Sequence, residues 1–266
     1  MMLEDSALSR QRCLIAVALL ASLAAACPTA ASAEREGDAQ GWNGSIGAGP
    51  AVFPRYVGGA ALHLLSIPLI SVNYKETIYV ELFRAGAVVF ASADRKAAFG
   101  LAAEPRWGFH SSDGQRLAGM TTRRTSIEGG PTFDWESGLA DVNVSYFTDV
   151  SNGTGGRSLR ASLSRDVIKS TPFILTATVG IDHVDAALRD YYFGIRPSEA
   201  TAARPAYAPG GGTDLLYGID GSYAWDRHHS VVFGLNATRL SDSAMRSPIV
   251  ERRNALAAWL GYAWRL

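Results

Sequence analysis

Apolar and polar residues alternate with a period of two along most of the chain. Near the C-terminus, for example, Leu256, Ala258, Leu260 and Tyr262 all fall on one face. A β-strand sends successive side chains to opposite faces, so this period predicts strands with one apolar face each. Helical periodicity is rare after residue 33. The pattern therefore predicts an all-β fold.

The alternation divides into about 12 segments, mostly near 10–13 residues long, and a tilted strand needs roughly 9–11 residues to cross a bilayer. Pro68 lies inside the second segment and weakens it locally, because proline lacks a backbone N–H. The predicted strands cover residues 42–53, 60–74, 77–84, 86–92, 96–109, 126–137, 140–150, 157–168, 171–184, 213–225, 229–240 and 254–266.

The connections between these segments alternate between short and long. Those near 93–95, 138–139, 169–170 and 226–228 are short, and those near 110–125, 151–156, 185–212 and 241–253 are longer. Short periplasmic turns and long outer loops are typical of outer-membrane barrels, whereas a soluble β-sandwich has no reason for this asymmetry. The sequence thus predicts a transmembrane antiparallel up-and-down β-barrel. Aromatic residues near segment ends indicate interfacial belts, with a sandwich core as the alternative: Trp42, Trp107, Trp135, Tyr146, Tyr223, Trp225, Tyr262 and Trp264.

The N-terminus has the layout of an export signal. Arg10 and Arg12 precede an alanine-rich apolar stretch, and Ala31-Ser32-Ala33 forms an A-x-A cleavage site. We therefore expect residues 1–33 to be a cleaved signal peptide and 34–266 to be the outer-membrane barrel domain. The alternatives are a membrane anchor, for which the stretch is short, and lipid attachment at Cys27, which lacks the usual leucine three places earlier.

Composition excludes several classes of protein. The 266 residues carry 25 basic and 25 acidic side chains, which excludes a polybasic nucleic-acid binder. A hydrophobic content of 47% excludes a disordered chain. Both cysteines, Cys13 and Cys27, fall within the predicted signal, so a mature chain would have no disulfide and no thiol chemistry.

The face opposite the apolar one would line the lumen, and on it acidic residues outnumber basic ones. One interpretation is a cation-preferring pore. The other is a filled lumen in which charges pair with each other and with loop residues. The candidate lumen charges are Glu104, Arg106, Asp134, Arg160, Asp166 and Asp182.

A search for catalytic residues finds little. Asp182 and His183 are neighbours on one strand, so they point to opposite faces and cannot form a dyad. None of the five histidines has a clear serine partner. No spacing suggests a metal site, and Gly210–Gly212 lacks the lysine of a phosphate loop. The sequence therefore predicts no enzyme, no cofactor and no metal.

A family resemblance rests on several loop segments in a fixed order. Gly47-Ala48-Gly49-Pro50 is followed by Pro54–Gly58, and the later long loops carry further signature positions. Together they resemble the MipA/OmpV family, the MltA-interacting proteins, from about residue 42 to the C-terminus. One departure is Leu266 at the end, where such chains usually have an aromatic residue; we expect Tyr262 and Trp264 to preserve assembly. The signature positions, without an assigned role, are Tyr191, Tyr192, Phe193, Gly194, Pro197, Tyr207, Ser247 and Pro248.

The resemblance implies a Gram-negative outer-membrane barrel that is surrounded by membrane lipid and does not bind nucleic acid. It also implies a scaffold role linking a murein hydrolase to a murein synthase in envelope and peptidoglycan maintenance. The strand count places the signature positions in outer loops, away from murein. Either periplasmic turns make the contact, or the count is wrong by one, or the role does not transfer. The alternatives to a scaffold are a small solute channel and, far behind, a barrel enzyme acting on lipid or peptide.

Overall fold

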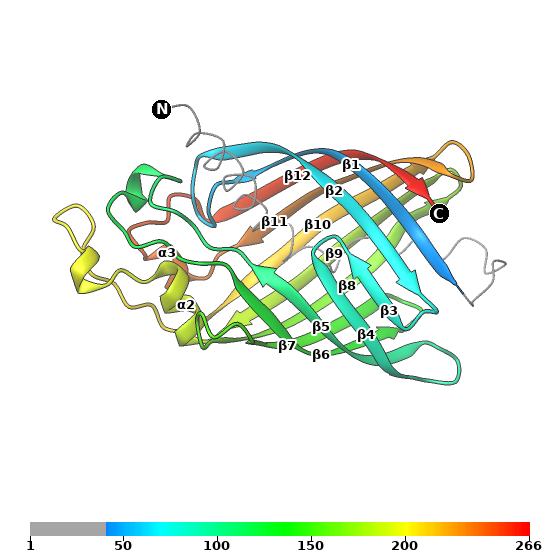
Figure 1. Cartoon of the computed structure of the whole chain (residues 1–266), viewed down its shortest axis with the longest axis horizontal. Helices are drawn as coiled ribbons and strands as arrows, with labels where there is room; N and C mark the ends of the chain where they lie inside the picture. Colours follow the sequence, from blue (N-terminus) through cyan, green and yellow to red (C-terminus); the bar gives the residue numbers. More distant parts are fainter. Residues whose placement is uncertain (1–40) are drawn as a thin grey trace, which may run out of the picture.

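Twelve antiparallel strands close into one barrel in the computed structural model, which describes residues 41–266 (Figure 1). Each strand pairs with its neighbours in sequence, and β12 pairs with β1. The predicted fold class is therefore confirmed. The strands are β1 (Trp42–Pro54), β2 (Leu62–Tyr74), β3 (Ile78–Glu81), β4 (Arg84–Ala91), β5 (Ala97–Arg106), β6 (Ser126–Glu136), β7 (Asp141–Asp149), β8 (Arg157–Ser170), β9 (Phe173–Val184), β10 (Gly212–Ala224), β11 (His229–Arg239) and β12 (Asn254–Arg265).

The predicted segments match these strands to within three residues at every end. The largest differences are at the segment 77–84, of which only 78–81 is the strand β3, and at 96–109, because β5 ends at Arg106. The signal peptide predicted for residues 1–33 lies outside the described residues. No helix among residues 41–266 is long and apolar enough to cross a membrane.

Apart from the tight turn 82–83 between β3 and β4, the connections segregate to the two ends of the barrel. The loop end carries the connections 55–61, 107–125, 150–156, 185–211 and 240–253, and the turn end carries 75–77, 92–96, 137–140, 171–172 and 225–228. Helices α2 (Ala186–Phe193) and α3 (Asp242–Met245) lie at the loop end, opposite the C-terminus (Figure 1). The short 3₁₀ turns η3 (Gln115–Leu117) and η4 (Pro197–Glu199) belong to the same loops. The predicted asymmetry between long and short connections is confirmed.

The outward face of the strands is apolar, as a lipid-facing surface requires. Leu163, Val179, Ile219 and Leu260 are each about half exposed on it. Aromatic rings gather at the turn end, where Trp225 stacks on His229 with centroids 5.9 Å apart and lies 6.1 Å from Tyr262. Of the predicted belt residues, Tyr146 is exposed in mid-strand. Six others are exposed at the turn end or at the adjoining strand ends: Trp42, Trp135, Tyr223, Trp225, Tyr262 and Trp264.

Trp107 was wrongly assigned to the belt. Because β5 ends one residue earlier, Trp107 begins a loop and turns inward. Its ring makes an edge-on contact with Phe83, with centroids 5.7 Å apart, and its Nε1 is buried. Interior packing therefore decides the position of this side chain.

Apart from Pro54 at the end of β1, four prolines lie within the strands, and each turns its nitrogen toward a place where strand pairing lapses. The β1–β12 register is broken at Pro50, and the β6–β7 register is broken at Pro131. The short hairpin β3–β4 lies between β2 and β5 only near the turn end. Pro68 on β2 and Pro105 on β5 lie closer to the loop end, where the hairpin no longer pairs with either strand. Proline cannot donate to a ladder, so these lapses are encoded in the sequence.

Candidate functional site

Five charged side chains from four strands meet in the middle of the lumen. Arg106 donates from Nε to Glu128 Oε1 at 2.6 Å and from Nη2 to Asp182 Oδ2 at 3.3 Å. Arg160 donates from Nη1 to Glu104 Oε1 at 2.8 Å, and its Nη2 lies 3.6 Å from Asp182 Oδ2. Asp182 therefore joins two arginines into one lumen network, and all five side chains come from the inward positions of their strands.

Four of the five side chains in the lumen network are almost completely shielded from solvent, and Arg106 is 19% exposed. Arg160 is 2% exposed and Glu128 is 1% exposed. Side chains lining a wide water-filled passage would be far more accessible. Charges in such an environment are stable only when they are paired and hydrogen-bonded, so the network closes the lumen at this level.

Four of the six predicted lumen charges thus come together in the lumen network, and two do not. Asp134 is exposed nearer the turn end and accepts a hydrogen bond from Asn143 Nδ2 at 2.6 Å. Asp166 is half-buried and accepts one from Thr176 Oγ1 at 2.7 Å. These carboxylates lie on the inward face but are separate from the ion pairs above them.

A loop arginine adds a second ion pair closer to the loop end. Arg189 of α2 donates from Nη1 to Asp214 Oδ2 at 2.9 Å and from Nη2 to the carbonyl of Gly212 at 3.0 Å. Asp214 Oδ1 also accepts the backbone N–H of Ser241 at 2.8 Å. The sequence indicated loop residues as partners of lumen charges but did not identify Arg189, since nothing in a loop sequence shows which side chain turns back into a barrel.

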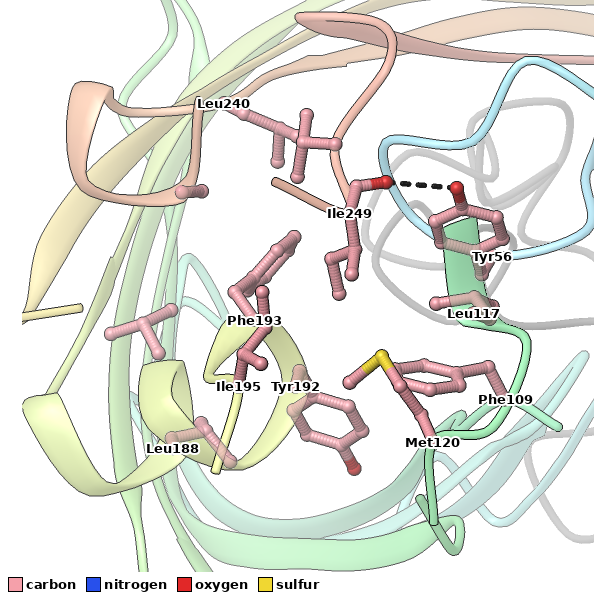
Figure 2. Close-up of a cluster of buried hydrophobic side chains, with 13 residues drawn as sticks. Tyr56, Phe109, Leu117, Met120, Leu188, Tyr192, Phe193, Ile195, Leu240 and Ile249 are labelled. Atoms are coloured by element: carbon pink, nitrogen blue, oxygen red, sulfur yellow. Dashed lines mark hydrogen bonds between the residues drawn. The ribbon is translucent and has the colours of Figure 1, made fainter. Parts of the chain in front are cut away.

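The long loops fold onto one another over the lumen and form a cap, made of residues 55–61, 107–125, 185–211 and 240–253. Their apolar side chains converge on a common core (Figure 2). Tyr56 donates its hydroxyl proton to the carbonyl of Ile249 at 2.8 Å, which ties the first loop to the last. The labelled core residues are Tyr56, Phe109, Leu117, Met120, Leu188, Tyr192, Phe193, Ile195, Leu240 and Ile249.

The signature positions are brought together in this cap. The hydroxyl of Tyr192 donates to the carbonyl of Arg106 at 2.9 Å and lies 3.0 Å from Ser126 Oγ, so it joins α2 to the barrel rim. Burial raises the pKa of Tyr192 to about 12. Tyr191 packs edge-on against Tyr192, and its carbonyl accepts Arg123 Nε at 2.8 Å.

The remaining signature residues connect loops that are distant in sequence. Ser247 Oγ donates to the carbonyl of Phe193 at 2.6 Å. Tyr207 donates its hydroxyl proton to the carbonyl of Ser243 at 2.7 Å, and the carbonyl of Pro248 accepts Arg116 Nη1 at 3.0 Å. Gly194 ends α2 against the side chain of Asp190, where a Cβ would lie 2.3 Å from Oδ1, and Pro197 begins η4. In this geometry the signature residues hold the cap together.

The sequence offers no sign of the most extensively hydrogen-bonded side chain of the cap, Arg123. Arg123 and Glu199 form a two-point ion pair, and Arg123 also donates to three loop carbonyls. The Arg123 guanidinium holds the pKa of the Glu199 carboxyl well below its usual range. A signal was present for Glu199, in the form of a proline two residues before it, Pro197, but its partner lies too far away in sequence to be inferred.

One side of the lumen is apolar. Phe53 is fully buried and packs with Ala51 of β1, Ile67 of β2 and Ala257 of β12. Leu82 and Phe83 of the β3–β4 turn and Trp107 pack against this apolar lumen cluster. Near the loop end, the inward positions of β12, β1 and β2 are mostly apolar and include Ala255, Ala257, Ala51, Phe53, Leu65 and Ile67, whereas those of β6 to β8 are mostly polar, so the lumen has two chemically different sides.

A cavity of about 60 Å³ lies where these parts meet beneath the cap. Its polar lining includes Arg106 and Asp182 of the lumen network and the second ion pair, Arg189 and Asp214. Its apolar lining includes Trp107 and side chains of the cap core. A space of this size is large enough for ordered water. The lining includes Tyr56, Val57, Arg106, Trp107, Asp182, Leu188, Arg189, Phe193 and Asp214.

No histidine among the described residues has a serine hydroxyl within hydrogen-bonding distance; the hydroxyl groups beside histidines belong to Thr122, Thr213 and Tyr262. His183 lies on the outward face with its Nδ1 2.9 Å from Thr213 Oγ1, while Asp182 points into the lumen. His229 Nδ1 lies 2.5 Å from the hydroxyl of Tyr262 within the aromatic belt. Residues 41–266 contain no group of three potential metal-ligating side chains.

Comparisons with known proteins agree with this architecture. The family model described as MltA-interacting protein MipA matches residues 46–266. Outer membrane protein Omp26La of Vibrio anguillarum is 29% identical over 138 residues, which is 52% of this chain and 53% of that protein. Outer membrane protein OmpV of Vibrio cholerae serotype O1 is 27% identical over 142 residues, covering 52% and 53%. The matched region spans about half the length of each of these curated relatives.

Solved structures show a weaker likeness. A bacterial polysaccharide outer membrane secretin aligns over 86% of this chain and 100% of that one, with a TM-score of 0.43 and 9% identity. OmpT of Vibrio cholerae aligns over 87% and 99%, with a TM-score of 0.36 and 9% identity. The barrel architecture therefore rests on the strand pairing itself.

Proposed function

Because the chain belongs to the MltA-interacting protein family, we propose that it is a non-enzymatic outer-membrane scaffold in envelope and peptidoglycan maintenance. The scaffold would act through its surfaces. The observation that carries this proposal is the burial of the lumen network, in which Arg160 and Glu104 are 2% and 3% exposed beneath the cap. A barrel filled in this way has little room for solute flow, so its exposed ends are the natural site of action.

The turn end is where such a scaffold would meet a murein-bound partner. In outer-membrane barrels the short turns face the periplasm and the long loops face outward. The turns 75–77 and 92–96 present charged side chains, among them Lys75, Glu76 and Arg95, whereas the signature residues lie in the cap. The partner class, a murein hydrolase or synthase, is suggested by the family name and requires a direct test.

The test is capture of a purified murein hydrolase of the MltA type by the purified barrel in detergent. One variant replaces the exposed turn residues 75–77 and 92–95 with glycine and serine. A matched control replaces the exposed loop tip 201–203, which lies at the opposite end. The scaffold proposal expects capture by the native barrel and the loop variant, and none by the turn variant. Absence of capture by the native barrel, or its loss in the loop variant alone, would contradict the proposal.

A small cation-preferring channel is the second candidate. It is favoured by Asp134 and Asp166, which make the inward face acidic near the turn end. A channel predicts ion conductance in planar bilayers, with cation preference reduced in Asp134→Asn and unchanged in Asp226→Asn, whose carboxylate lies in the turn 225–228. A bilayer that stays silent with correctly folded protein would rule out this alternative.

A further inference from the structure

The barrel wall has a gap in backbone pairing on the side of β2. The β2–β3 ladder ends at Ser71↔Glu81, and the last bond beyond it is from Leu82 N–H to the carbonyl of Ile70 at 2.6 Å. The backbone N–H and C=O of Ile70 point toward β3. Because backbone polar groups alternate in direction along a strand, those of residues 68, 66, 64 and 62 point to the same side of β2. Between described residues these edge groups form no backbone hydrogen bond.

The opposite side of the gap is the end of β5. Ala97 accepts the N–H of Ser92, so the odd-numbered residues of β5 direct their polar groups toward β4. The β4–β5 pairing ends at Ala85↔Ala103, below Pro105. We name the region between residues 62–69 of β2 and residues 105–107 the wall notch. In Figure 1 the β3–β4 turn ends about midway along the barrel, while β2 continues to the loop end.

The wall notch faces lipid. Leu62 and Leu64, on the outward side of β2, are 55% and 69% exposed. Ile70 is opposite Ile46 of β1, which is opposite Trp264 of the aromatic belt, so β2 rises from the belt through the apolar zone. In hydrocarbon an open strand edge is unfavourable unless something pairs with its polar groups.

The prolines of the wall notch argue against a neighbouring strand as the occupant. Pro68 and Pro105 each point a nitrogen without a hydrogen into the notch, which removes a donor from either edge. A strand from a second copy could not form a regular ladder there, because prolines at an edge prevent strand addition.

The remaining groups suit a lipid. Behind the notch lies the apolar lumen cluster, with the Phe83–Trp107 contact spanning the space between the β3–β4 turn and the end of β5. The N–H groups of Leu62, Leu64 and Ser66 are donors in need of acceptors. Arg55 follows β1 beside the start of β2, where its N–H donates to the carbonyl of Ala61 at 2.9 Å, and its side chain has no ion pair among residues 41–266.

We propose that the wall notch binds one acyl chain of an anionic membrane lipid. The acyl chain lies against the Phe83–Trp107 pair and the outward side chains Leu62 and Leu64 of β2, the ester oxygens accept the free N–H groups, and the anionic headgroup lies by Arg55. The site is independent of any scaffold role, because it is on the membrane-facing wall and not on the turn end. It makes the barrel a receptor for a specific lipid of the surrounding leaflet.

Photo-crosslinking of the native chain in vesicles tests the site. Phosphatidylcholine vesicles carry a small fraction of phosphatidylglycerol with a photoreactive group on its acyl chain, and adducts are mapped by mass spectrometry. The proposal expects adducts on Phe83 and Trp107, in addition to those on outward residues such as Phe99. The same photoreactive chain on phosphatidylcholine should label Phe99 equally and the notch weakly.

Two test variants and one control variant sharpen the result. Phe83→Ala removes a wall of the site and should reduce adducts at Trp107, whereas Phe99→Ala, which removes an outward ring of the same size, should leave them unchanged. Arg55→Ala should reduce notch labelling by phosphatidylglycerol to the phosphatidylcholine level. Adducts confined to outward residues, equal notch labelling by both lipids, or cross-links between copies at β2 without Trp107 adducts would overturn the proposal.

Discussion

Arg123 and Glu199 are 76 residues apart in sequence, yet they form two hydrogen bonds, of 2.8 and 2.7 Å, inside the cap. Glu199 also accepts the backbone N–H of Thr121 at 2.9 Å and that of Arg196 at 3.2 Å. The pair therefore joins the loop after β5 to the loop after β9 through both side chains and backbone. Both partners are buried, so the cap depends on this contact more than on its exposed charges.

Replacing Arg123 with alanine should loosen the cap without unfolding the barrel. The change leaves Glu199 buried without its cation, which costs about 3–5 kcal/mol. Hydrogen exchange of residues 185–211 should accelerate accordingly, while exchange in the strands stays slow. Arg246→Ala, a change at an exposed loop position, serves as the control. Unchanged exchange in the Arg123 variant would show that the apolar core alone holds the cap.

The same pair predicts how the cap responds to acid. The folded-state pKa of Glu199 lies below the unfolded value of about 4.3, because Arg123 donates to the carboxylate. Its contribution to stability is therefore complete above the unfolded pKa and is lost as the pH falls through the folded pKa. Resistance of the cap to proteolysis by an acid protease should persist to about pH 4 and decline only in stronger acid. In Glu199→Gln this acid-dependent decline should be weaker.

Arg160→Ala should destabilise the barrel itself. Without this guanidinium, Glu104 loses its ion pair and Asp182 retains only Arg106, a loss of about 3–5 kcal/mol for a buried group. The temperature at which the folded barrel shifts its mobility on a detergent gel should fall. Lys169→Ala provides the comparison, since its exposed pair with Asp166 contributes about 0–1 kcal/mol. Equal shifts for the two variants would contradict the role assigned to the lumen network.

Conductance measurements should show whether the cap or the lumen network closes the barrel to ions. A variant in which residues 196–206 are replaced by a short glycine-serine link removes η4 and opens the cap, but leaves the network of Arg106, Arg160 and Asp182 in place. It should remain silent in planar bilayers. Adding Arg160→Ala to that variant should produce conductance. Current from the shortened loop alone would mean that the cap is the main barrier.

The barrel could be predicted from the sequence because its lipid-facing residues repeat every second position. The segment that becomes β10, for example, alternates Leu215, Tyr217 and Ile219 with Asp214 and Asp220, and its bounds were predicted to within one residue. β3 was predicted twice as long as it is, because apolar alternation continues through a turn whose residues pack inward.

The cap was harder to predict, since its contacts join distant loops through side chains that follow no period. The signature positions were identified by resemblance, but only the structure shows that Ser247 bonds to the carbonyl of Phe193. Trp107 shows a related limit, because its local sequence suggests a position that its side chain does not take. An aromatic residue near a strand end fits an interfacial belt, and its burial depends on one residue of strand length.

The packing of the cap also determines what an immune system or a selection experiment would encounter on the cell surface. Linear peptides from the loop after β9 display Tyr192, Phe193 and Ile195, which the native protein hides in the shared core. Antibodies raised against such peptides should bind denatured protein and ignore intact cells. Recognition of the living surface would require epitopes assembled from several loops at once, so only folded protein would serve as a useful antigen.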